Sequence, residues 1–184
     1  MHLLLIDRNA SMVEAWKEVF GNEENVTVMR GDLTEVSCDA IVSPANSFGF
    51  MDGGVDYAIS ERLGWQLQEK LQADIRQLPE GELLVGKALV VPTGDEIIPY
   101  LISAPTMRVP MNFNIATSIN AYLAMKATLI AAERHPRIES IAATGFCTGV
   151  GRMSPTVCAE QMYQAFQEII LGERLSFQDW GDAQ

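Results

Sequence analysis

Cysteine and histidine are both scarce in this sequence of 184 residues. The three cysteines, Cys38, Cys147 and Cys158, are odd in number and form no CxxC pair, which argues against a disulfide framework and a zinc knuckle. The two histidines, His2 and His135, lie at a chain end and a helix end, where solvation or capping explains them better than a nucleophilic triad does. We therefore predict reduced thiols, a cytoplasmic location and no metal site.

Long apolar runs and basic runs are also missing. The run "HLLLID" (residues 2–7) is stopped by Asp7, so we expect neither a secretory signal nor a membrane span. A net charge of −11 without a run of Lys or Arg argues against long nucleic acid as a partner. No P-loop or GxGxxG motif occurs, which excludes ATPase and dinucleotide dehydrogenase classes, and we predict no cofactor.

Strand-like and helix-like segments alternate along most of the chain. Strands are expected at 2–7, 25–30, 39–43, 138–146 and twice within 86–106, and helices at 9–20, 55–78 (interrupted or bent near Gly64), 114–134 and from Ser154-Pro155 onward. For the first helix, Ser11 and Glu14 have the spacing of a capping box. This alternation predicts an α/β fold, a three-layer α/β/α sandwich with a mixed, mostly parallel central sheet. Residues 1–184 are expected to form one domain, with 172–184 as a C-terminal tail.

Two glycine-rich loops each follow a predicted strand and precede a helix. They are "SPANSFGFMDGGVDYAIS" (residues 43–60) and "CTGVGRM" (residues 147–153). Ligands of open α/β sheets bind at the carboxyl ends of strands, and amides at a helix start attract phosphate. A pyrophosphate held between the two loops is one interpretation, and two surface turns that need glycine are the other. Cys147, beside the second loop, is either an activated thiolate or an apolar filler.

Four short motifs occur in an order that is typical of one family. They are "GDLT" (31–34), "DAIVSPAN" (39–46), "GGVDYAI" (53–59) and "TGVG" (148–151). Together they resemble the signatures of macrodomains, and the resemblance covers nearly the whole chain. It implies an α/β/α fold that binds ADP-ribose or an ADP-ribosylated small molecule or protein, whereas the oligomeric state stays open.

The resemblance also implies roles for individual residues. Asp32 matches the carboxylate that accepts the adenine amino group, although a turn residue is the alternative. Asn46 matches a residue that faces the distal ribose, and Asp56 matches one that orients or activates water, or is simply an acidic residue favoured in a first helical turn. Arg152 is either a phosphate contact or an exposed residue without a specific role. The implied ligand-binding set is Asp32, Leu33, Ala45, Asn46, Gly53, Gly54, Val55, Thr148, Gly149, Val150, Gly151 and Arg152, with Asn46 and Asp56 as the catalytic pair.

Departures from the family pattern keep the function open. Ser43 stands in place of an Asn, Met51 and Asp52 replace two glycines, and Gly151 stands where many relatives have an aromatic ring. The sequence of residues 43–72 resembles a bacterial and phage-associated branch of the macrodomains. The sequence therefore predicts ADP-ribose binding and leaves three alternatives. The first is an enzyme that hydrolyses an ADP-ribosyl ester, O-acetyl-ADP-ribose or ADP-ribose 1''-phosphate. The second is a non-catalytic reader of ADP-ribose, and the third is a structural, phage-tail-associated protein that keeps the fold without turnover.

Overall fold

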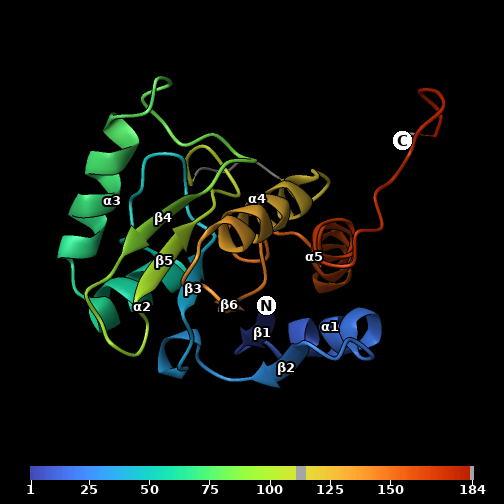
Figure 1. The fold of residues 1–184 in the computed structure, drawn as a ribbon, viewed down its shortest axis with the longest axis horizontal. Coiled ribbons are helices and arrows are strands. Elements are labelled where there is room, and N and C mark those ends of the chain that lie inside the picture. Colours follow the sequence, from blue (N-terminus) through green and yellow to red (C-terminus); the bar gives the residue numbers. More distant parts are fainter. Residues whose placement is uncertain (111–114, 183–184) are drawn as a thin grey trace.

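The computed structural model describes residues 1–110 and 115–182, and it has one six-stranded sheet between two layers of helices (Figure 1). The strand order is β2-β1-β6-β3-β5-β4, and every pair is parallel except the antiparallel pair β4 and β5. The strands are β1 His2–Asp7, β2 Val26–Arg30, β3 Ala40–Ser43, β4 Leu89–Pro92, β5 Tyr100–Ser103 and β6 Ser140–Ala143. The helices are α1 Ala10–Phe20, the short 3-10 helix η1 Leu33–Glu35, α2 Gly54–Leu63, α3 Gln66–Arg76, α4 Asn120–Arg134 and α5 Pro155–Ile169. The predicted mixed, mostly parallel α/β/α sandwich is confirmed.

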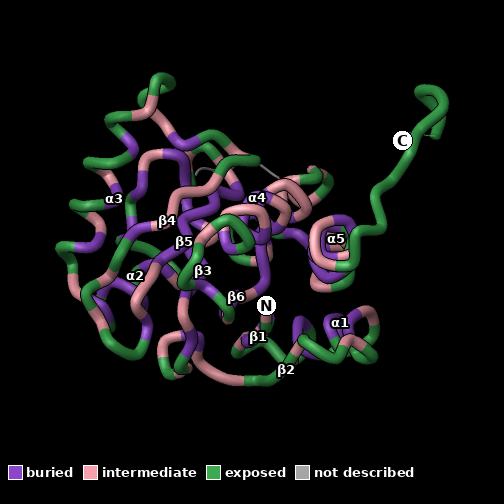
Figure 2. The backbone as a smooth tube through the Cα atoms, in the orientation of Figure 1, coloured by how far each residue is buried: buried purple, intermediate pink, exposed green. Residues whose placement is uncertain are grey.

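Alternating side chains of the central strands fill two separate hydrophobic clusters. In β1, Leu3 and Leu5 pack with α1, α4 and α5, whereas Ile6 packs with α2 and α3. In β3, Val42 belongs to the first cluster and Ile41 to the second. Successive residues of a strand point to opposite faces, so near-continuous apolar strands are what a sheet covered on both sides needs. In Figure 2 the buried residues, drawn in purple, are concentrated in the strands and on the sides of the helices that face them.

Two local predictions about helix boundaries had different outcomes. The interruption near Gly64 is confirmed, because Gly64 has φ 98° and separates α2 from α3. The capping box at Ser11 and Glu14 is wrong. The N-cap of α1 is Asn9, whose Oδ1 accepts the Ser11 amide at 2.9 Å. Asn is as good a cap as Ser, and here it begins the helix two residues earlier.

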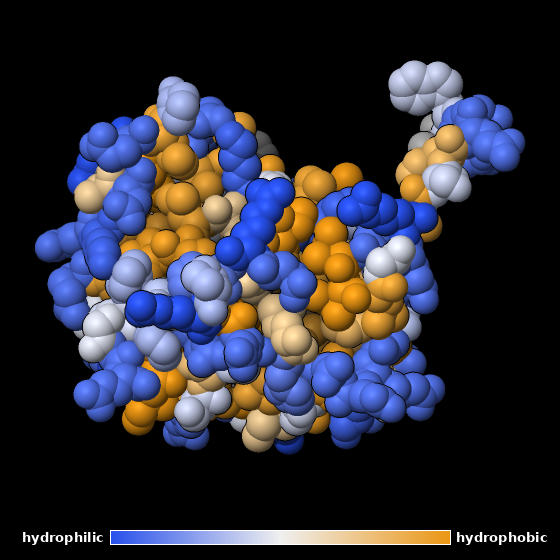
Figure 3. Space-filling view, viewed as in Figure 1, coloured by the Kyte–Doolittle hydropathy of each residue, from blue (hydrophilic) through white to orange (hydrophobic). Residues whose placement is uncertain are grey.

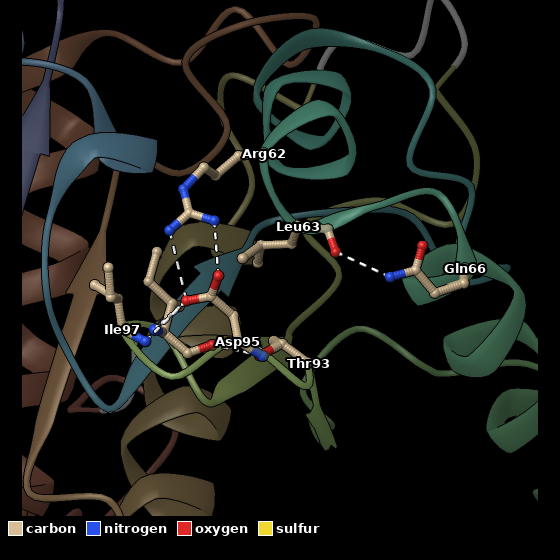
Figure 4. A network of polar contacts seen from close by, with 7 residues as sticks. Arg62, Leu63, Gln66, Thr93, Asp95 and Ile97 are labelled. Carbon is tan, nitrogen blue, oxygen red and sulfur yellow. Dashed lines mark hydrogen bonds and ion pairs between the residues drawn. The ribbon is translucent and has the colours of Figure 1, made fainter.

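The turn between β4 and β5 is fastened to α2 by an ion pair (Figure 4). The two guanidinium nitrogens of Arg62 reach the two carboxylate oxygens of Asp95 at 2.8 and 3.5 Å. Asp95 Oδ1 also accepts the amides of Ile97 and Ile98, each at 2.9 Å. The carboxylate therefore both closes its own turn and connects the antiparallel edge of the sheet to the helix layer of α2.

The segment that follows α5 extends away from the body of the molecule (Figures 1 and 3). Residues 171–182 are all exposed, and the side chain of Trp180 is 90% exposed. The predicted start of the helix at 114–134 lies outside the described residues, and the corresponding helix α4 begins at Asn120. In the described part of the chain, no helix combines the length and the apolar character that crossing a bilayer requires.

Candidate functional site

A cleft made of two adjoining chambers lies at the carboxyl ends of β1, β3, β5 and β6. The larger one, here called the loop chamber, has a volume of about 310 Å³ and is lined by both glycine-rich loops. The smaller one, the Asp32 chamber, has a volume of about 210 Å³. Gly54, Val55 and Thr144 line both, so the two chambers adjoin each other. The loop chamber contains ten of the predicted residues: Ala45, Asn46, Gly53, Gly54, Val55, Asp56, Thr148, Gly149, Val150 and Gly151.

The first loop ends at the N-terminus of α2, which faces the cleft without a side-chain cap. The N-cap residue is Gly53, which has no side chain that could accept a hydrogen bond from the first amides of the helix. Gly54 has φ 57°, a left-handed conformation that glycine adopts without steric cost. Among the described residues, none accepts a hydrogen bond from the amides of Gly53, Gly54 or Val55. These amides and the helix dipole therefore offer a site for an anion.

The second loop supplies a further set of amides. No described residue accepts a hydrogen bond from the amides of Thr148, Gly149, Val150 or Gly151. The loop is closed behind them, where the Met153 amide donates to the Cys147 carbonyl at 2.9 Å. A Cβ on Gly151 would lie only 2.6 Å from that same carbonyl oxygen, so the loop needs glycine there.

The N-terminus of α5 does not take part in this cleft. Ser154 caps the helix itself, because its hydroxyl accepts the Val157 amide at 3.3 Å. Neither Ser154 nor Pro155 lines either chamber. The expectation that both loops would present a helix start is therefore met only at α2, and the second loop contributes its own backbone amides alone.

Asn46 lines the loop chamber, but its amide group is engaged within its own loop. Its Oδ1 accepts the amides of Phe48 and Phe50 at 3.1 and 3.2 Å, and its Nδ2 donates to the Phe50 carbonyl at 2.9 Å. The side chain is 6% exposed. Asn46 therefore shapes residues 46–50 in this structure, a role that its motif did not predict.

Asp56 is a buried carboxyl group in the first turn of α2. It is 7% exposed, lines the loop chamber, and its Oδ1 accepts the Ser43 hydroxyl at 2.5 Å. Burial raises the pKa of Asp56 to about 7, the negative charge of Asp52 raises it further, and the Ser43 hydrogen bond partly opposes both. A carboxyl group with this pKa changes protonation near neutral pH, as a general acid or base does.

Cys147, whose role the sequence left open, is not an activated nucleophile. It lines the loop chamber with φ 63°, yet it is 5% exposed. Burial raises the pKa of its thiol to about 12, and a hydrogen bond with Thr106 opposes this only in part. Cys147 is therefore a protonated apolar group in the wall of the cleft.

The Asp32 chamber is built around a carboxylate that is both capped and ion-paired. Asp32 Oδ1 accepts the amide and the hydroxyl of Thr34 at 2.9 and 2.8 Å, and Oδ2 pairs with Arg8. The Thr34 amide, followed by Arg8, holds the pKa of Asp32 below its usual value despite some desolvation. Leu33 lies in the same wall, and Asp7 closes the floor by accepting the Thr144 hydroxyl at 2.7 Å.

Several lining residues were not predicted, and one predicted residue lies outside the cleft. Arg8 is the one Lys or Arg side chain among the described residues that line either chamber, and its only signal was its place directly after a strand. Phe50 and Thr106 also line the loop chamber without a motif to indicate them. Arg152 is exposed and belongs to neither lining. Within the described residues, no group of three His, Cys, Asp or Glu side chains is placed to hold a metal ion.

Comparisons with known proteins show the family and the fold of the chain. Residues 42–162 match the family model described as Macro domain. An uncharacterized protein of Aquifex aeolicus is 33% identical over 146 residues, which are 78% of this chain and 82% of that protein. The fold is similar to the Oceanobacillus iheyensis macrodomain with ADP, with a TM-score of 0.66 and 21% identity over 79% of this chain and 76% of that chain. It is also similar to the Trypanosoma brucei macrodomain in complex with ADP-ribose, with a TM-score of 0.57 and 21% identity over 76% of this chain and 56% of that chain.

Proposed function

Because the chain belongs to the Macro domain family, we propose that its cleft binds ADP-ribose or a molecule that carries it. The observation that carries the proposal is the set of backbone amides in the two loops, which line one cavity and have no acceptor among the described residues. A diphosphate is the ligand group that matches them, since it offers several anionic oxygens over a short span. Amide donors hold phosphate without a basic side chain, so binding is compatible with a net charge of −11.

The Asp32 chamber is the proposed adenine subsite. A carboxylate oxygen is a suitable acceptor for the exocyclic amino group of adenine, and Oδ2 of Asp32 is engaged only by Arg8 in the described structure. The Arg8 side chain is 76% exposed, so it can shift toward the ligand at little cost. The sugar attached to the far phosphate then lies in the loop chamber, beside Asn46 and Asp56.

Hydrolysis is the second part of the proposal. Asp56 has the burial, the position in the loop chamber and the pKa of about 7 that suit a residue activating water beside the distal sugar. An ADP-ribosyl ester or O-acetyl-ADP-ribose would be the substrate. A non-catalytic reader is the competing function, and one observation favours it: the Asn46 amide already makes three hydrogen bonds within its loop.

Calorimetric titration tests the binding proposal. ADP-ribose should bind more tightly than ADP, because ADP lacks the distal ribose that would contact the loop chamber. ADP should bind more tightly than AMP, because AMP lacks the second phosphate that would contact the loops. Asp32→Ala should weaken ADP-ribose binding by about 1.5–3 kcal/mol, the value of a hydrogen bond to a charged group. Asp74→Ala, a change of an exposed carboxylate on α3, is the matched control and should bind like the wild type. Absence of ADP-ribose binding at millimolar concentration would sink the proposal.

Turnover is tested separately from binding. Wild-type protein and Asp56→Ala are incubated with a mono-ADP-ribosylated protein, and released ADP-ribose is quantified. Release by the wild type that Asp56→Ala abolishes supports hydrolysis. Binding heat with no release by the wild type identifies a reader.

A further inference from the structure

The charges in the loop chamber are all negative among the described residues. Asp52 and Asp56 both line it, and no Lys, Arg or His of the described residues does. The neighbouring sequence "MNFN" (residues 111–114) adds no charged residue type. The one basic lining residue, Arg8, belongs to the Asp32 chamber at the other end of the cleft. A ligand in this cleft therefore meets Arg8, which is paired with Asp32, at one end, and at the other end two carboxyl groups with no basic lining residue among those described.

The buried carboxyl group at that end has an unused acceptor. Asp56 Oδ1 is occupied by Ser43, whereas none of the described residues donates a hydrogen bond to Oδ2. Asp56 is more than nine-tenths buried and still lines the chamber, so its remaining lone pairs can be satisfied from the cavity. Buried carboxylate oxygens are normally hydrogen-bonded, and a bound group that donates or carries positive charge would meet that need.

The lining of the loop chamber also includes an aromatic ring and an apolar side chain. Phe50 and Val150 line the chamber and are 50% and 59% exposed, so both are accessible to a ligand there. An aromatic ring next to two carboxyl groups suits a flat or alkylated cation, which gains from the ring face as well as from the charges. The same surroundings disfavour a phosphate, which carries about −1.5 to −2 charges near neutral pH.

On the basis of the proposed function, we propose that the loop chamber selects ADP-ribose derivatives whose substituent on the distal sugar is positively charged, and disfavours those that end in a third phosphate. The two backbone loops bind the shared diphosphate, and Asp52 with Asp56 discriminates between the groups beyond it. Asp52 is the residue that determines this specificity, because it is exposed and lines the chamber, whereas Asp56 is buried.

NAD⁺ and NADH are suitable probes, because they have nearly the same size and differ by one positive charge on the ring attached to the distal sugar. ADP-ribose is the reference ligand, and ADP-ribose 1''-phosphate is the anionic probe. Titrations are made at pH 8, above the pKa of about 7 of Asp56, with the wild type, Asp52→Asn and the control Asp74→Asn. A unit charge about 4 Å from another is worth about 1 kcal/mol even in water, which is about five-fold in affinity.

The wild type should bind NAD⁺ about five-fold or more tightly than NADH, and should bind ADP-ribose more tightly than ADP-ribose 1''-phosphate. Asp52→Asn should reduce both ratios several-fold, while Asp74→Asn should leave both unchanged. Equal binding of NAD⁺ and NADH, failure of both to bind, tighter binding of the 1''-phosphate, or ratios that Asp52→Asn does not change would each overturn the inference while ADP-ribose still binds. If ADP-ribose itself does not bind, the proposed function has failed instead.

Discussion

Substituting Asp56 by Asn should stabilise the protein, and by more at alkaline pH than at acid pH. The carboxyl group has a folded pKa of about 7, mainly because burial disfavours its charged form, against 3.8 for the ordinary group. The unfolded chain therefore ionises first as pH rises. Stability is fully retained below the ordinary value, declines between pH 4 and 7, and stays at its lower level above pH 7.

The size of the effect follows from the two pKa values. A difference of about three units corresponds to about 4 kcal/mol at pH 8. At pH 4 the penalty has fallen below about 1 kcal/mol, because the group is then neutral in the folded protein and only about half ionised in the unfolded one. Asn keeps an oxygen that can accept the Ser43 hydroxyl and carries no charge. The variant should therefore gain about 4 kcal/mol at pH 8 and little at pH 4.

Urea unfolding followed by far-ultraviolet circular dichroism measures this difference, with wild type and variant compared at each pH. Asp74→Asn removes an exposed carboxyl group on α3 and should change stability little at either pH. A gain for Asp56→Asn that is the same at pH 4 and pH 8 would refute the reasoning, because it would mean that the buried group titrates alike in both states. A loss at pH 8 would show that the charged carboxylate is held by contacts stronger than its desolvation.

Three further outcomes are expected. Gly151→Ala should destabilise the protein by about 1–3 kcal/mol in urea unfolding, because its Cβ would lie 2.6 Å from a carbonyl oxygen. A Cβ at Gly149 meets nothing within 4 Å, so Gly149→Ala should be nearly neutral. Equal losses of stability in the two variants would contradict the loop geometry. The three cysteines are buried, and the Cys147 thiol has a pKa raised to about 12, so a thiol reagent at pH 7.5 should label the native protein slowly and the urea-unfolded protein at once; fast native labelling would contradict this. Lys126→Met should cost about 1–3 kcal/mol, because it leaves the buried Glu168 carboxylate without the ammonium group 2.6 Å away, and unchanged unfolding would show that Tyr122 alone suffices.

The fold was predictable because its signals are local. Short apolar strands, a glycine that interrupts a helix at Gly64, and Ser154-Pro155 at a helix start each act over a few residues, and the structure has all three features. The N-cap of α1 was predicted at the wrong residue because local signals there favour two positions equally. Asn9 and Ser11 are both good N-cap residues, and only the backbone geometry decides between them.

For the candidate site, the sequence indicated the segments that line the cleft but not the contacts within them. Motif order indicated which loops meet, and the structure brings those loops to one cleft. Partners that lie far apart in sequence gave no signal: Ser43 donates to Asp56 across 13 positions, and Arg8 pairs with Asp32 across 24. The hydrogen bonds of Asn46 within its own loop also depend on a backbone path that its motif does not specify.

The position of the two loops has a mechanical consequence. The first loop leads into α2, whose apolar side chains belong to one hydrophobic cluster, and the second precedes α5, whose side chains belong to the other. A ligand whose phosphates contact both loops would connect the two hydrophobic clusters at the carboxyl ends of the strands. Nucleotide binding should then raise the melting temperature of both helical layers together, because it stabilises the segments that lead into each of them.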